Sequence, residues 1–141
     1  MPRSLALGAA LLSVAIPVCA AESLCPETIG VKQTLAAPAP EWTVSTRATP
    51  TSLEMVTFYS GPPKDEASLV YDELARAPEG SIATWKFPKD PRGYWVKCSY
   101  RGTTQELAKA LPATLSSCRV TYERQAAGVS GLPAIKRIAC Q

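Results

Sequence analysis

The chain has 141 residues, no histidine and a formal net charge of +3. So small a charge, evenly dispersed, gives no argument for nucleic acid or an anionic membrane as a partner. Without histidine, the chain cannot build a Ser-His-Asp or Cys-His nucleophile pair, a histidine-ligated zinc site or histidine acid–base catalysis. Its 13 prolines favour short strands and turns over long helices.

The first twenty residues have the pattern of a secretory signal peptide. A basic start, an apolar run over Leu5 to Ile16 and small residues before Ala21 form its three parts. We expect residues 1–20 to be removed and residues 21–141 to form a single domain in the periplasm, with no membrane insertion after cleavage. Cys19 raises a lipoprotein alternative, which the proline and valine before it fit poorly.

Four cysteines remain after this cleavage, and an even number in an exported domain indicates two disulfides. They are Cys25, Cys98, Cys118 and Cys140. Of the three possible pairings we favour Cys118 with Cys140, because both lie on β-like segments that flank a Gly/Pro-rich turn, and this leaves Cys25 with Cys98. The cysteine spacings are long and irregular, so we expect no metal site and no cofactor.

The predicted elements are mostly short strands. In chain order, strands are expected at Ile29–Leu35, Trp42–Thr46, Leu53–Tyr59, Ser81–Phe87, Tyr94–Arg101, Cys118–Glu123 and Ile135–Cys140, the last two as a hairpin. Asp65–Arg76 and Thr104–Leu111 have helical spacing of apolar residues, and for both an extended alternative stays open. The pattern predicts a mainly β fold, a small antiparallel sandwich or barrel joined by two disulfides, with at most one or two short helices.

Several of these segments together resemble a known family. The resemblance covers Cys25-Pro26, Phe58-Tyr59-Ser60-Gly61-Pro62-Pro63, Thr84-Trp85-Lys86-Phe87, Tyr94-Trp95-Val96-Lys97-Cys98-Ser99-Tyr100, Leu111-Pro112 and Cys118-Arg119-Val120. The family is one of small uncharacterised exported proteins of Gram-negative bacteria. It implies residence in the periplasm, extended strands at Leu69-Val70 and Leu107, and no catalytic residues. Tyr71 stands where that family usually has a proline.

Two features suggest protein binding. On the clearest strand, Trp95 shares a face with Lys97, Ser99 and Arg101, and an exposed Trp among cations is typical of an interaction hot spot. The alternative is that another strand or loop covers Trp95.

The second feature is the stiff turn Gly61-Pro62-Pro63, which could present a recognition loop or could simply end a buried strand. Trp42 and Trp85 are interpreted as core residues.

The composition therefore favours a non-catalytic module that binds a periplasmic or envelope protein, as inhibitors and immunity proteins do; its oligomeric state stays open. The first alternative is a structural or envelope-stress accessory protein without a tight partner. The second is a small hydrolase that uses carboxylates, for which Asp65 and Asp72 would share a helical face.

Overall fold

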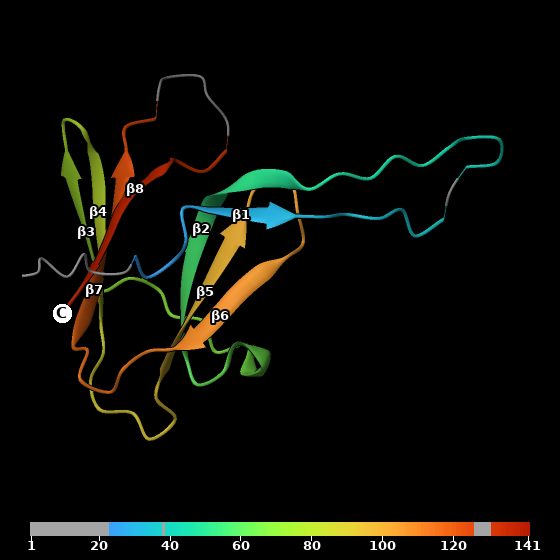
Figure 1. Cartoon of the computed structure of the whole chain (residues 1–141). Coiled ribbons are helices and arrows are strands. Elements are labelled where there is room, and N and C mark those ends of the chain that lie inside the picture. The colour runs from blue at the N-terminus through green and yellow to red at the C-terminus, as the bar shows by residue number, and fades with distance from the viewer. Residues whose placement is uncertain (1–22, 38, 126–130) are drawn as a thin grey trace, which may run out of the picture.

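The computed structural model describes residues 23–37, 39–125 and 131–141, so the expected signal peptide lies outside the described residues. The described residues form two four-stranded antiparallel sheets, with strand orders β1-β2-β5-β6 and β3-β4-β7-β8 (Figure 1). The strands are β1 (Thr28–Val31), β2 (Thr49–Ser60), β3 (Glu73–Ala77), β4 (Gly80–Lys86), β5 (Tyr94–Tyr100), β6 (Glu106–Ala110), β7 (Ser117–Glu123) and β8 (Ile135–Cys140). One 3-10 turn, η1 (Pro63–Asp65), follows β2. The predicted mainly β, antiparallel fold is confirmed.

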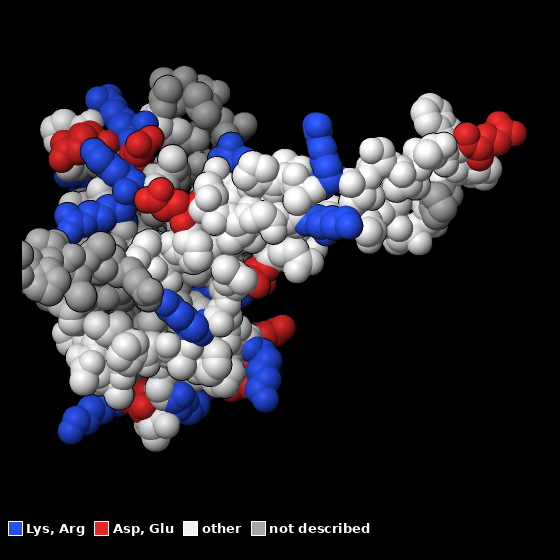
Figure 2. All heavy atoms as spheres, viewed as in Figure 1, with Lys and Arg blue, Asp and Glu red and all other residues white. Residues whose placement is uncertain are grey.

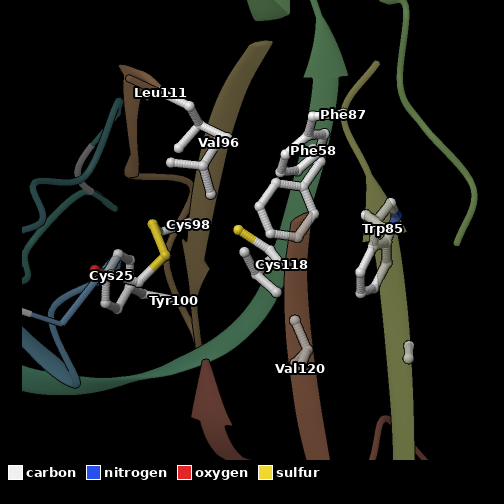
Figure 3. Close-up of a cluster of buried hydrophobic side chains, with 12 residues drawn as sticks. Cys25, Phe58, Trp85, Phe87, Val96, Cys98, Tyr100, Leu111, Cys118 and Val120 are labelled. Atoms are coloured by element: carbon white, nitrogen blue, oxygen red, sulfur yellow. A yellow bond between two sulfur atoms is a disulfide. The ribbon is translucent and has the colours of Figure 1, made fainter. Parts of the chain in front are cut away.

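The core fills the space between the two sheets. Figure 3 shows Phe58 of β2 among side chains from both sheets, with its ring centroid 5.0 Å from that of Trp85 and 5.5 Å from that of Phe87. Successive side chains of a strand point to opposite faces. Val96 of β5 therefore points into this core, where it is fully buried, while its neighbour Trp95 points outward.

Two disulfides join distant parts of the chain. Cys25 pairs with Cys98, which ties the start of the described chain to β5, and Cys118 pairs with Cys140 across the β7–β8 hairpin. This is the pairing that the sequence analysis favours. Cys25 and Cys118 are fully buried, so both bonds belong to the core.

Neither segment with helical spacing is an α-helix. Asp65–Arg76 contains the end of η1, a single bridge between Ser68 and Tyr59, and most of strand β3. Thr104–Leu111 contains β6, so Leu107 is extended, as the family resemblance implies. Each segment pairs along the open edge of a neighbouring strand, β4 or β5. The backbone partners gained there outweigh intrinsic helix propensity.

The expected strand Trp42–Thr46 is also absent. The pairing of β1 with β2 ends at Val31 opposite Thr49. The segment between them, residues 32–48, is here called the arm, and its described residues, 32–37 and 39–48, extend away from both sheets (Figure 1). Trp42, interpreted above as a core residue, is 78% exposed. A strand needs a neighbouring strand to supply hydrogen bonds and cover, and the arm leaves the sheets before one is available.

Candidate protein-binding surface

Trp95 and Lys97 lie together on the outer face of the first sheet. Trp95 is half-buried and opposes Tyr59 of β2 on one side and Ala110 of β6 on the other. The Lys97 Nζ lies 5.6 Å from the centroid of the Tyr59 ring, within cation–π range. The predicted pair is thus brought together, and Tyr59, which sequence reasoning missed, completes the group.

A carboxylate on β6 holds this lysine in place. Glu106 lies 3.2 Å from Lys97 Nζ and accepts a 2.8 Å hydrogen bond from the Ser99 hydroxyl. Hydrogen bonding to Tyr59 and Glu106 raises the pKa of Lys97, and the bonds from Ser99 and Lys97 lower the pKa of Glu106. Lys97 therefore stays charged but is held against the sheet, so it adds polarity and little net charge to the surface.

Arg101 does not belong to this group. It follows the end of β5, is exposed, and its Nε lies 3.5 Å from a carboxylate oxygen of Glu54. It lies six positions after Trp95 along the chain, or about 20 Å away in an extended strand. The backbone N–H of Arg101 donates to the Ser52 carbonyl in the β1–β2 pair, next to the base of the arm. The predicted Trp95–Lys97–Arg101 face is thus two separate places.

The Gly61-Pro62-Pro63 turn presents little free surface. Gly61 is buried, has a φ of 82°, and donates its N–H to the carbonyl of Gly93 at 2.8 Å. Pro62 and Pro63 are half-buried, and Pro63 is the first residue of η1. This geometry favours the interpretation of a turn that ends a buried strand.

A polar cluster beside this turn connects β2 to the loop before β5. The buried Ser60 hydroxyl donates to Asp90 and accepts a 2.6 Å hydrogen bond from the Arg92 guanidinium. Hydrogen bonds lower the pKa of Asp90. The largest effect comes from the Ser60 hydroxyl and a smaller one from the Arg92 backbone N–H. The three side chains satisfy one another, as expected of a structural cluster.

The arm is the largest exposed feature that sequence reasoning missed. Leu35, Trp42 and Val44 are 63%, 78% and 44% exposed. Residues 33–35, Ala39 and residues 42–46 line a hollow between the two legs of the arm. The signal was present in the sequence, because Trp42 has polar neighbours and follows Pro40, a context that does not build a core strand.

The structure does not provide the pair of carboxylates on one helical face that the hydrolase alternative requires. Asp65 ends η1, whereas Asp72 accepts a 2.7 Å hydrogen bond from the amide of Lys86, so the two carboxylates share no helical face. In the part of the chain that the structure describes, no group of three Cys, Asp or Glu side chains could hold a metal ion. The same residues contain no helix long and apolar enough to cross a membrane.

Together, these features define a disulfide-bonded β module that offers the half-buried, outward-facing Trp95 and an exposed arm for contact with another protein. The model of the family described as "Type VI secretion system Tli immunity protein" matches residues 39–141, and the chain belongs to that family. The protein is therefore a non-catalytic, protein-binding immunity module. This family is more specific than the resemblance to exported proteins and is compatible with it. No curated protein and no solved structure gave a significant match.

Proposed function

We propose that this protein resides in the periplasm and there binds and blocks a lipase effector toxin of the type VI secretion system. The family match over residues 39–141 carries the proposal. Two disulfides support an oxidising compartment. The signal-peptide pattern of residues 1–20 supports export.

Protection by binding alone requires a tight complex. A non-catalytic module cannot destroy the toxin, so it has to occupy nearly every molecule of it. With a Kd of about 1 nM and about 100 nM free immunity protein, roughly 1% of the toxin stays active. Protection is then stoichiometric, and it disappears when toxin exceeds immunity protein.

We place one contact on the outer face of β5, at Trp95. Trp and Tyr are enriched at the energetic centres of interfaces, and the held Lys97 supplies a polar rim. Arg101 lies at the other end of the strand and would contribute separately. Gly61, Pro62 and Pro63 would contribute to binding indirectly, by fixing the shape of the turn that ends β2.

The test is protection of living cells. The effector, directed to the periplasm of a susceptible bacterium, should lyse or arrest it, and co-expression of the full-length chain should restore growth. A chain that lacks residues 1–20 should not protect, because it stays on the wrong side of the inner membrane and its disulfides do not form. Equal protection by both chains would contradict the periplasmic assignment.

A purified assay tests the mechanism. Phospholipid hydrolysis by the effector, titrated with oxidised immunity protein, should fall linearly and end at an equimolar ratio. Hydrolysis that continues at tenfold excess would contradict inhibition by binding.

A further inference from the structure

The arm has the form of a binding element and no evident role in folding. Its 17 positions, residues 32–48, join two paired strands that a short turn could have joined, and its described residues contain no helix or strand. Loops of this length without secondary structure are uncommon in small domains and are usually either functional elements or linkers. Every described residue of the arm is exposed. These residues therefore contribute no buried side chain to the core.

The arm concentrates apolar surface far from the body. Leu35 and Val44 lie on its two legs, and Trp42 lies near its tip, where its backbone N–H donates to the Ala39 carbonyl at 3.2 Å. Eight extended residues span at most about 26 Å, which sets the reach of each leg. The outer part of the arm can therefore enter a cleft while the two sheets remain outside it.

Charge along the arm separates its tip from its base. Lys32 and Arg47 occupy the base, where Figure 2 shows basic side chains, and Glu41 occupies the tip beside Trp42. Neither base cation has an ion-pair partner among the described residues. A partner that fits has an apolar cleft with an acidic rim.

We propose that the arm inserts into the apolar substrate cleft of the effector, with Trp42 as its anchor and with Lys32 and Arg47 against the rim. The inference rests on the proposed function, because an enzyme that hydrolyses lipids needs a deep apolar site for acyl chains. Apart from the hydrogen bond between Trp42 and Ala39, no backbone hydrogen bond joins the described residues of the arm, so their N–H and C=O groups can pair with the walls of such a cleft. Occupation of that cleft excludes substrate directly.

The charge pattern disfavours a lipid bilayer as the occupant. Insertion of Trp42 into a membrane would carry the Glu41 carboxylate to the anionic headgroups and leave Lys32 and Arg47 away from them. Basic residues beside the inserted aromatic would be expected instead.

The test measures binding of the full mature chain to the type VI lipase effector of the same strain, with its catalytic nucleophile replaced. We expect Trp42→Ala to weaken binding by roughly 30-fold or more, the lower bound for a hot-spot residue. The matched control is Val70→Ala, because Val70 is an 81% exposed apolar side chain on the body of the protein. It should bind like the unchanged chain, and both variants should melt at the unchanged temperature.

The competing outcomes are distinguishable. Equal affinity of Trp42→Ala and the unchanged chain would overturn the arm inference and leave the proposed function intact. No binding by the unchanged chain would overturn both. A photo-crosslinker at position 42 should label the effector near its nucleophile, and labelling elsewhere would overturn the cleft assignment. Trp42-dependent sedimentation with phosphatidylglycerol–phosphatidylethanolamine vesicles, or Trp42-dependent dimerisation, in place of effector binding would also overturn it.

Discussion

The three tryptophans have three different environments, and each environment gives the side chain a different role. Trp85 is buried, and its indole N–H donates to the Leu69 carbonyl at 3.2 Å, so it stabilises the fold. Trp95 is half-buried and can serve both the sheet and a partner. Trp42 is mostly in water, which leaves a large apolar area whose burial can stabilise only a complex.

A glycine at the start of β4 gives a test of the backbone. A Cβ at Gly80 would lie 1.9 Å from the carbonyl oxygen of Tyr122, and a backbone atom cannot move aside as a flexible side chain can. We expect Gly80→Ala to lower the free energy of unfolding by at least about 2 kcal/mol, measured by urea denaturation. Gly30→Ala is the control, because its Cβ would meet nothing within 4 Å. Similar stabilities for the two variants would contradict this close approach.

At the scale of elements, the two disulfides differ in how much of the chain they close. Cys25 and Cys98 are 73 positions apart, and Cys118 and Cys140 are 22 apart. The chain-entropy model gives about 4 kcal/mol for the longer loop and about 3 kcal/mol for the shorter. The β7–β8 ladder also holds the shorter loop, since Cys118 and Cys140 are direct cross-strand partners.

We therefore expect the Cys25→Ala/Cys98→Ala variant to lose more stability than Cys118→Ala/Cys140→Ala. Urea midpoints of the two variants, each with its other disulfide intact, measure the difference. A larger loss from the hairpin disulfide would mean that strain or residual structure outweighs loop closure.

The sequence predicts strands with a buried face better than the exposed edge strands β3 and β6, and the edge strand β8 is observed at its expected bounds, Ile135–Cys140. The strand expected at Tyr94–Arg101 matches β5 closely because one face of β5 is buried in the core and the other is only partly buried, which makes its residues alternate. β3 and β6 lie at sheet edges, and all but one of their residues are exposed, so no alternation marks them. The β6 residues Glu106–Ala110 are good helix formers, and only the free edge of β5 makes them a strand.

The candidate surface was also predictable only in part from the sequence. Alternation along β5 places Trp95 and Lys97 on one outward face, and the structure agrees. Tyr59 and Glu106 could not be found, because their contacts with Lys97 depend on which strands neighbour β5 and in what register. Pro40 and the polar neighbours of Trp42 argue against a core strand, whereas the absence of a neighbouring strand, which leaves Trp42 exposed, is a property of the whole fold.

At the scale of the whole molecule, the ionisable groups predict a broad stability plateau. The chain has no histidine, and its described cysteines are paired, so the described residues include no side-chain type whose ordinary pKa lies between about 5 and 9. Hydrogen bonds lower the pKa of Asp90 and Glu106 below their usual 3.8 and 4.5. Burial raises the pKa of Tyr100 and Tyr122 above 10.0.

Proton linkage gives the direction in which the free energy of unfolding changes at low and at high pH. A carboxylate with a lowered pKa binds fewer protons in the folded state, so its stabilisation is complete above about pH 4.5 and is lost as the pH falls. A tyrosine with a raised pKa holds its proton longer when folded, so its contribution is complete below about pH 10 and is lost above it. Urea midpoints from pH 3 to 11 should therefore be level at neutral pH and fall at both ends. Glu106→Gln should reduce the acid fall and leave the alkaline fall unchanged, because only the carboxylate can lose its charge. A midpoint that peaks sharply near pH 6 to 7, or an unchanged acid fall in Glu106→Gln, would show that other groups control the transition.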